Sequence, residues 1–411
     1  MPQIKPFKGF LPPHDLAETI SSPPYDVISE NEARLIIKLY PYSFLRVIKP
    51  EIDFNSKSNL DSFTIHKRAK ENLNNLIETK KLIQDEQESF YLYQIKQNSH
   101  IQTGIVATVS VDEYDSGIIK KHELTRPDKE DDRTMHINIT NANTGPVFLT
   151  FKNDLSIQKI LETIIIKKPS LSFQLKDKTL HKIWRVNSKQ NIDKLINYFK
   201  QIDKFYIADG HHRAASASRV QKLRITNNKH HKGNEHYNYF LSVIFPDDEM
   251  NIIDYNRVVD GLNGLSVNKL ITALKTHFDV NILPRSEKPN IPHNFSMYID
   301  GKWYLLKTKN NILSKDPINN LDASILQNYI LGPILNIKNP RTNNNIEFVG
   351  GIKGLEGIEK KCNTKTKVGF VLHPVLIDDL FKVSDLNKIM PPKSTWFEPK
   401  LRSGLIVRLL D

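Results

Sequence analysis

One segment of the chain restricts the possible folds more than any other. Between Lys182 and Arg224 the residues are expected to form, in order, a strand (Lys182 to Val186), a helix (Ile192 to Gln201), a strand (Phe205 to Ala208), a sharp turn and a helix (His212 to Arg224). Strands that alternate with helices are typical of folds in which helices cover a sheet. We therefore expect an α+β protein, with mixed sheets and flanking helices.

The composition excludes several other classes of protein. Apolar residues make up 39% of the 411 residues and charged residues 25%, which is too apolar for a disordered chain. The single cysteine, Cys362, excludes a disulfide framework and any cysteine-ligated zinc or iron–sulfur site. No apolar run reaches the roughly 18 residues needed to span a membrane, and the N-terminus lacks a signal-peptide core. We expect a cytoplasmic protein.

The length allows one large domain or several smaller ones. Because no low-complexity linker interrupts the chain, we expect two integrated lobes. Residues 1–250 would form a catalytic lobe that carries the turn. Residues 251–411 would form a second lobe, whose C-terminal loop returns to the site.

The chain carries 58 Lys and Arg against 46 Asp and Glu, a net charge of +12. A basic balance can indicate nucleic acid, anionic lipid or phosphorylated small molecules as partners. Here the lysines are spread along the whole chain, including stretches with no other feature. Most of the charge is therefore expected on a solvated surface.

The turn after the strand Phe205 to Ala208 has the composition of an anion site. It contains Asp209, Gly210, His211, His212 and Arg213, directly before a helix. Backbone N–H groups at such a turn, together with the helix dipole, attract phosphate, and Arg213 can bind its oxygens in a bidentate manner. Either histidine can act as acid, base or nucleophile.

A second candidate segment is Lys120 to His136, in which ten of seventeen residues are Asp, Glu, Lys or Arg. Such a segment can be a salt-bridged surface helix or loop. Pro127 favours a charged loop between two strands, a usual place for a site. His122, Glu123 and Arg126 would be its inner residues, and Asp128, Asp131 and Asp132 could hold a divalent cation.

Two further segments lie in the C-terminal part. Met390 to Arg402 contains two prolines followed by Lys393, Ser394, Thr395 and Trp396; Lys393 and Lys400 are candidate phosphate contacts and Glu398 a candidate base. The strand around Arg257 would bury an arginine that needs a partner. Arg257, Ser394 and Thr395 are further candidate contacts for a phosphate or nucleotide.

Standard nucleotide and hydrolase motifs are missing from the sequence. It contains no GxxxxGK[ST], no GxGxxG after a strand, and no HExxH, GxSxG or DxDxDG. Any phosphate chemistry would therefore use an uncommon scaffold.

The segments PPYDVIS, KKHELTR, NANTGPV, ADGHHR, YNRVV, FVGGI and MPPKSTWFEPKLRSG resemble those of the DUF1015 family of uncharacterised bacterial and archaeal proteins. The likeness covers essentially the whole chain. The chain departs from it at Asn339 and Asn343, where acidic residues are expected. The family is linked to the ParB, sulfiredoxin and free-serine-kinase superfamily, so the resemblance implies a ParB-like strand-helix-strand-turn-helix core whose glycine turn holds nucleotide phosphates.

The resemblance also implies phosphoryl transfer at O-phosphoserine or free serine, either phosphatase-like or nucleotide-dependent, with Mg²⁺ and ADP or ATP as cofactors. Gly210, His211, His212 and Arg213 would hold phosphate, helped by Lys120, Lys121, Arg126 and Lys393. Glu123 or Glu398 would accept or deliver the proton of the serine hydroxyl group. The alternative is a ParB-like nucleotide- or DNA-binding protein. Nucleic acid is the less expected partner, because the basic residues of these segments alternate with acids. A regulator that binds phosphoserine without turnover is a third possibility.

Overall fold

The computed structural model describes residues 1–55 and 60–410. The chain divides into two compact units. The first contains Met1–Lys121, Thr125–Met250 and Pro399–Asp411, and the second contains His122–Leu124 and Asn251–Glu398. The expected division placed all of 251–411 in the second lobe, whereas the structure assigns the last segment to the first unit.

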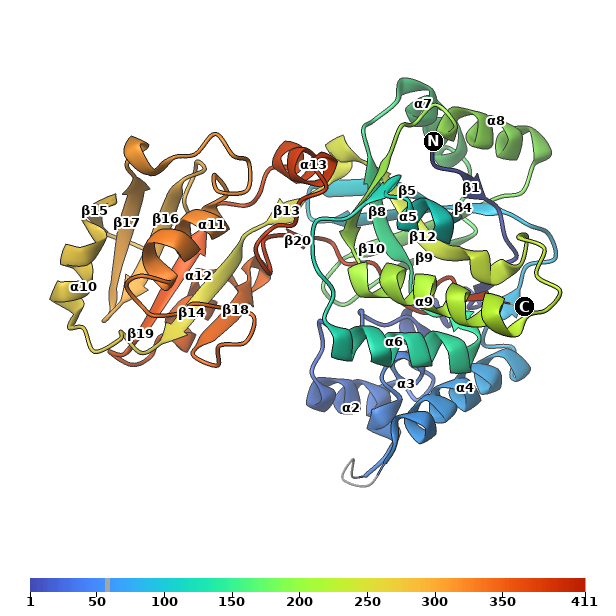
Figure 1. Ribbon diagram of the computed structural model, residues 1–411. Coiled ribbons are helices and arrows are strands. Elements are labelled where there is room, and N and C mark those ends of the chain that lie inside the picture. The colour runs from blue at the N-terminus through green and yellow to red at the C-terminus, as the bar shows by residue number, and fades with distance from the viewer. Residues whose placement is uncertain (56–59, 411) are drawn as a thin grey trace. The chain divides into compact units, whose positions relative to one another are not determined.

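The first unit is built on a nine-stranded mixed sheet (Figure 1). Its order is β6-β11-β8-β12-β5-β4-β10-β9, and β1 pairs with β5. The strands are β6 (Ile119–Lys120), β11 (Phe205–Asp209), β8 (Val147–Phe151), β12 (Tyr239–Pro246), β5 (His100–Ser110), β4 (Phe90–Gln97), β10 (Leu180–Val186), β9 (Leu171–Gln174) and β1 (Ile4–Lys5). Apolar residues of both faces are buried, as expected for a sheet covered by helices.

The strand-helix-strand-turn-helix segment is present as β10, α8 (Lys189–Phe199), β11 and α9 (His211–Asn227). Its two strands are not neighbours, because β4, β5, β12 and β8 lie between them. The segment therefore crosses most of the sheet. The α+β class is confirmed.

Helices pack on this sheet and on one another. α6 (Pro127–Thr140) contacts α9 and α4 (Ser62–Glu78), and α7 (Leu155–Ile165) contacts α8. α2 (Glu30–Leu39) begins with a capping box between Ser29 and Glu32. The remaining elements of the unit are α1 (Ala17–Ile20), α3 (Leu45–Ile48), α5 (Val111–Asp115), β2 (Phe10–Leu11), β3 (Ile83–Gln84), β7 (Ala142–Asn143) and β21 (Arg408–Leu409).

The charged segment around Pro127 is a helix rather than the expected loop. Pro127 occupies the first turn of α6, where the missing N–H costs nothing and the fixed φ suits a helix. The prediction was wrong because Pro127 was taken to interrupt a helix, whereas a proline in the first turn of a helix is well tolerated.

The second unit contains a six-stranded antiparallel sheet of order β15-β17-β16-β19-β14-β18. The strands are β15 (Phe278–Leu283), β17 (Lys302–Thr308), β16 (Asn294–Ile299), β19 (Lys367–Leu372), β14 (Tyr255–Asp260) and β18 (Ile346–Gly350). A small ladder pairs β13 (Ile252–Ile253) with β20 (Trp396–Phe397). The helices are α10 (Val267–Leu274), α11 (Asp322–Leu326), α12 (Gly354–Lys361) and α13 (Ile377–Asp385).

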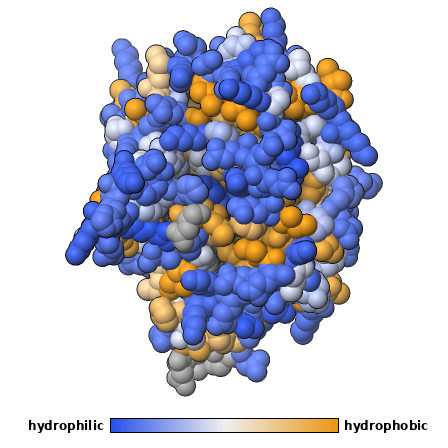
Figure 2. All heavy atoms as spheres, turned by 90° about the vertical axis from the view of Figure 1, so that its right-hand side faces the viewer, coloured by the Kyte–Doolittle hydropathy of each residue, from blue (hydrophilic) through white to orange (hydrophobic). Residues whose placement is uncertain are grey.

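Each unit has its own buried apolar cluster, the first around Phe151, Phe199 and Phe205 and the second around Phe278, Phe295 and Phe370. On the face drawn in Figure 2, hydrophilic residues predominate and hydrophobic residues form separate patches. In the described ranges, no helix combines the length and the hydropathy that a membrane crossing requires.

Candidate active site

The turn between β11 and α9 is the centre of the candidate site. Gly210 joins the strand to the helix with φ +93°, a left-handed conformation that costs glycine little. A Cβ built there would lie 3.4 Å from Val147 Cα. That distance is an ordinary van der Waals contact, so the left-handed φ is the reason that glycine is favoured here.

Asp209 is held at this turn from two directions. Its Oδ1 accepts a hydrogen bond from the Gly210 N–H at 2.8 Å, and its Oδ2 pairs with Lys400 Nζ at 2.9 Å. Burial alone would raise the pKa of Asp209, but Lys400 and Arg213 outweigh it and bring the pKa below the usual value. Asp209 is thus a stable carboxylate, and the predicted residues Asp209 and Lys400 do meet.

The two histidines of the turn have different surroundings. His211 is buried, whereas His212 is partly exposed. His212 Nε2 accepts a hydrogen bond from the backbone N–H of Arg126 at 3.1 Å. Because this nitrogen acts as an acceptor, the proton of a neutral ring lies on Nδ1.

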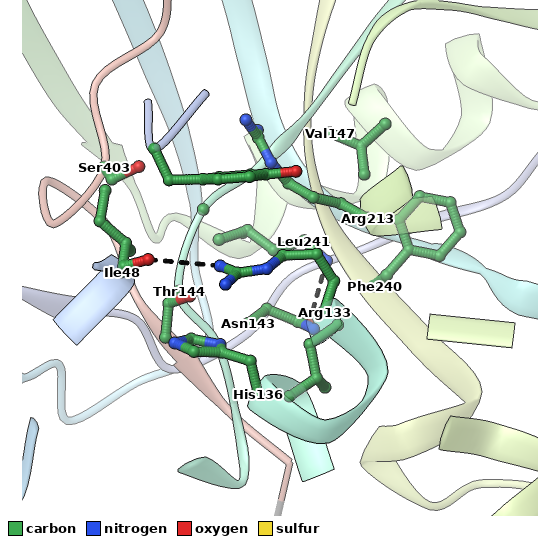
Figure 3. A pocket seen from close by; sticks show the side chains of 13 residues that line it. Ile48, Arg133, His136, Asn143, Thr144, Val147, Arg213, Phe240, Leu241 and Ser403 are labelled. Atoms are coloured by element: carbon green, nitrogen blue, oxygen red, sulfur yellow. Dashed lines mark hydrogen bonds between the residues drawn. The ribbon is translucent and has the colours of Figure 1, made fainter. Parts of the chain in front are cut away.

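Arg213 points into a cavity of the first unit (Figure 3). Its guanidinium donates to the carbonyl oxygen of Pro146 and lies 5.9 Å from the ring centre of Tyr25. Within the described residues Arg213 forms no salt bridge. We call this cavity the arginine pocket; it holds about 460 Å³ of empty space, its open mouth included. Its lining residues are Tyr25, Ile48, Arg133, His136, Ile137, Asn143, Thr144, Gly145, Val147, Arg213, Phe240, Leu241 and Ser403.

A second arginine reaches the same pocket from α6. Arg133 is buried, and its guanidinium lies 4.3 Å from the Tyr25 ring centre. It pairs with Asp132 Oδ2 at 2.6 Å and donates to the Ile48 carbonyl oxygen at 3.3 Å. Two guanidinium groups therefore surround one tyrosine ring, an arrangement favoured by cation–π attraction.

Tyr25 and His136 are uncharged at neutral pH. Burial raises the pKa of Tyr25 to about 12, although Arg133 and Arg213 act against this. Burial also lowers the pKa of His136 to about 3, and its Nε2 donates to the Val47 carbonyl oxygen at 2.8 Å. Among the side chains that line the pocket, the charged groups are thus the two arginines.

The arginine pocket forms where several segments that were singled out in the sequence meet. β8 begins beside the end of β11, and Asp209 pairs in register with Phe148. Ser403 is fixed by backbone hydrogen bonds to Ser22 in both directions. Tyr25, Arg133, His136 and Ser403 were not predicted as site residues. Arg133, His136 and Ile137 are spaced by three and four residues, and this shared face becomes visible only once Pro127 is read as a helix start.

The predicted residues of the second unit gather around one loop. His122 Nε2 lies 3.2 Å from Thr395 Oγ1, and the Met390 N–H donates to the His122 carbonyl oxygen at 2.8 Å. The Ser394 hydroxyl donates to the Pro391 carbonyl oxygen at 2.7 Å. Lys393 lies in the left-handed region, with Nζ 5.9 Å from the Tyr255 ring centre.

Arg257 and Glu398, which were also predicted as site residues, both form hydrogen bonds with neighbouring groups of the protein. Arg257 is buried and donates to the carbonyl oxygens of Pro392 and Lys393 at 3.2 and 3.1 Å, and burial lowers its pKa to about 10. Glu398 is buried and accepts a hydrogen bond from Trp396 Nε1 at 2.7 Å. These contacts favour a role in shaping the loop, and the phosphate-binding and base roles stay predictions.

The predicted cation ligands are paired with basic groups. Asp128 is exposed and bonds Arg126 at 2.9 Å. Asp132 bonds Arg133, and its Oδ1 lies 3.2 Å from His66 Nε2. In residues 1–55 and 60–410, no three His, Cys, Asp or Glu side chains are placed to hold a metal ion. Asp131, the third predicted ligand, pairs with Arg219 at 2.7 Å. The geometry gives no support to a protein-held metal at these three carboxylates.

Three predicted residues remain. Lys121 is exposed and its Nζ lies 4.7 Å from the Tyr114 ring centre. Lys120 belongs to β6, next to β11 in the sheet, and Glu123 is partly exposed.

Three solved structures resemble this chain only remotely. SbnI with a C-terminal truncation from Staphylococcus aureus is 10% identical, with a TM-score of 0.37 over 72% of this chain and 85% of that chain. A free serine kinase mutant in complex with AMP is 13% identical, with a TM-score of 0.36 over 71% and 87%. A conserved hypothetical protein from Pyrococcus furiosus is 15% identical, with a TM-score of 0.34 over 71% and 90%. Scores this low carry no argument about this chain.

No curated protein matches the chain. A family model does match, over residues 4–324, and its description is "Protein of unknown function (DUF1015)". The segments that form the arginine pocket from Tyr25 to Leu241 all fall inside this range. On this match, the chain belongs to the DUF1015 family.

Proposed function

We propose that the first unit is a phosphoryl-transfer enzyme that binds a nucleotide in the arginine pocket. The observation that carries the proposal is the pair of guanidinium groups, Arg213 and Arg133, beside Tyr25 at the start of α9. Guanidinium groups bind phosphate oxygens in a bidentate manner, and a helix N-terminus adds N–H donors. Arg213 forms no salt bridge in the described part of the chain, and its nearest acidic influence, Asp209, is paired with Lys400, so the Arg213 guanidinium would be available to bind a phosphate.

The residues at the turn have distinct proposed roles. Arg213 and the first N–H groups of α9 would bind the phosphate, and Lys400 would offset further negative charge. Asp209 would orient Lys400 through their 2.9 Å contact. His211 or His212 would accept or deliver the proton of the acceptor hydroxyl. Charge neutralisation and positioning of this kind are the main requirements of phosphoryl transfer.

We propose free serine and O-phosphoserine as the substrate pair, which rests on the family resemblance alone. Mg²⁺ commonly reaches such sites on the nucleotide phosphates, with one or two carboxylates of the protein. We therefore expect any magnesium to bind with the nucleotide.

The first experiment measures turnover. The purified protein is incubated with phosphoserine, with and without ADP and Mg²⁺, and serine, phosphate and ATP are quantified. A nucleotide-dependent enzyme produces serine and ATP only when ADP is present. A phosphatase releases phosphate without ADP. If neither product forms in any arm, the proposed substrates are wrong.

The second experiment tests the pocket by calorimetric titration with ADP and ATP. Arg213→Ala should weaken binding at least about tenfold, because a charge-assisted bidentate contact contributes roughly 1.5–3 kcal/mol. Arg213→Lys, which keeps the charge but loses the planar fork, should be intermediate. Arg224→Ala, at the other end of α9, is the matched control. Equal affinity in Arg213→Ala and the control would remove the pocket from the proposal.

The alternative is binding of duplex DNA, which the same variants test at about 150 mM salt. Contacts that depend only on backbone charge weaken there. Tight, sequence-selective binding that Arg213→Ala abolishes would favour the alternative.

A further inference from the structure

A second cavity of the first unit lies at the opposite end of strands β8 and β12 from the arginine pocket. β8 and β12 are parallel. The arginine pocket touches their first residues, including Val147 and Phe240, whereas the second cavity touches their last, Phe151 and Pro246. We call it the acidic pocket; it holds about 440 Å³ of empty space, its mouth included. It is lined by Thr103, Phe151, Asn153, Ile157, Gln158, Leu161, Glu162, Ile165, Pro246, Asp248 and Glu249.

One side of the acidic pocket is apolar. Phe151 at the end of β8 and Ile157 and Leu161 on α7 are buried members of the main core. Ile165 packs against the same cluster from the last turn of α7. These side chains form a wall that suits methylene groups and does not suit a hydrated inorganic ion.

The charged groups of the pocket all have one sign. Glu162, Asp248 and Glu249 contribute three carboxylates, and the lining contains no lysine or arginine. This contrasts with the net charge of +12 of the whole chain. Burial raises the pKa of Glu249 above its usual value, although the Thr103 N–H donates to this carboxylate. A cation in the pocket would offset that cost.

Asn153 supplies a buried acceptor with no donor. Its Nδ2 donates to Asp248 Oδ2 at 2.7 Å, which fixes the orientation of the amide. Its Oδ1 is buried and has no hydrogen-bond partner in the described structure. A buried acceptor without a donor is costly, so the site lacks one hydrogen-bond donor.

We propose that the acidic pocket binds an organic primary ammonium group on a short alkyl chain. The ammonium has three N–H donors and no acceptor, which matches the three carboxylates of the lining. The alkyl chain would lie along Phe151, Ile157 and Leu161. Such a group can come from a free alkylamine or from a lysine side chain of another protein. This site is independent of the proposed activity, because it lies at the other end of β8 and β12.

The test is calorimetric titration of the full chain with 1,4-diaminobutane, n-butylamine, n-butanol and Nα-acetyl-lysine amide. We expect saturable binding of the amines, none of butanol, and weaker binding as salt is added. Preference for the free amines identifies a metabolite-type ligand, and preference for the lysine amide identifies a protein side chain; both support the ammonium site. If butanol binds as well as butylamine, or if no ammonium compound binds, the proposal is wrong.

Variants locate the binding. Glu162→Gln and Asp248→Asn keep the shape of each side chain but remove a charge, and each should weaken binding by about fivefold, the effect of one partly exposed ion pair. The double variant should weaken it more than tenfold. Glu78→Gln, at the end of α4 and outside the lining, is the matched control. Unchanged affinity in a double variant that unfolds like the control would place the amine elsewhere and overturn the assignment.

Discussion

At the residue scale, Asp209 and Lys400 link segments 191 positions apart. Both side chains are largely buried, with exposed fractions of 28% and 17%, so solvent screens their attraction only in part. Asp209 has a pKa below its usual value in the folded chain. Its contribution to stability is therefore present above the usual carboxyl pKa and is lost as the pH falls.

We expect Lys400→Met to lower the free energy of unfolding at pH 7 by about 2 kcal/mol, because it leaves a largely buried carboxylate unpaired. The loss should shrink below about pH 4, where Asp209 of the variant becomes protonated. Urea unfolding at pH 7 and pH 3 measures both values, with the exposed Lys200→Met as control. An equal loss at the two pH values would indicate lost packing instead of a lost charge pair.

His181 gives a second prediction at this scale. It is buried against Phe173, its Nδ1 lies 2.9 Å from Tyr93 Oη, and burial lowers its pKa to about 3. Because the unfolded chain binds this proton near pH 6.5, stability falls as the pH drops from about 6.5 to 3, by about 1.4 kcal/mol per pH unit for each such histidine.

His136 behaves in the same way. We expect His181→Gln to remove about 1.4 kcal/mol per pH unit from the slope measured between pH 6 and pH 4, while the slope due to His136 remains. Urea unfolding at intervals of half a pH unit gives the slopes. If the variant keeps the full slope, His181 is already protonated in the folded state.

Residues whose chemistry is local could be predicted from the sequence, whereas residues that a distant element brings to the site could not. Asp209, Gly210 and Arg213 lie within five residues of one another at a strand end, so the turn that brings them together could be predicted from the sequence. Tyr25 reaches Arg213 only through tertiary packing, and nothing in its local sequence shows this. Lys400 pairs with the carboxylate of Asp209, a contact between distant segments that the sequence did not indicate, and its contact with phosphate stays a prediction.

At the element scale, α6 shows that a proline predicts a helix end only when its position relative to the helix is known. The four elements between Lys182 and Arg224 were predicted to within three residues, because apolar periodicity and caps are local signals. Pro127 was misread, since whether a proline ends or begins a helix depends on the residues after it. The order of the strands was also beyond local signals. β10 and β11 were expected as one unit, yet four strands lie between them.

The helical state of α6 is what places Arg133 and His136 at the pocket. Met135 lies in the helix between them and is partly exposed, so it tolerates changes in side chain. We expect Met135→Pro to cost about 3 kcal/mol, because it removes a mid-helix hydrogen bond and clashes with the preceding turn. Nucleotide binding should be lost with it.

Met135→Ala is the matched control and should retain the stability, within about 1 kcal/mol, and the affinity of the native chain. Circular dichroism and calorimetry measure both properties. If Met135→Pro binds nucleotide like Met135→Ala, the face of α6 with Arg133 is not part of the binding site.

At the scale of the whole molecule, the first unit is discontinuous in sequence. Pro399–Asp411 returns to it after the chain has formed the second unit. The returning segment pairs β21 with β7, Val407 with Phe10 and Ser403 with Ser22. It also buries Leu405, Val407 and Leu410. The first unit therefore depends on residues that follow the second unit in the sequence.

This dependence predicts that a chain ending at Glu398 has a destabilised first unit and a second unit of nearly native stability. The three tryptophans separate the two, because Trp184 lies in the first unit and Trp303 and Trp396 lie in the second. The comparison uses truncated and full-length variants that keep only Trp184 or only Trp303. Truncation should lower the urea midpoint reported by Trp184 and leave the midpoint reported by Trp303 unchanged within error.

A synthetic peptide of residues 399–411 should restore the Trp184 midpoint in a concentration-dependent way, because it binds the folded unit and not the unfolded chain. A peptide with Lys400→Met and Val407→Ser is the control and should restore less. Restoration of the midpoint should be accompanied by recovery of nucleotide affinity, since Ser403 lines the arginine pocket. If truncation leaves the Trp184 midpoint unchanged, the first unit folds without its last segment, and Ser403 contributes to the pocket without holding the unit together.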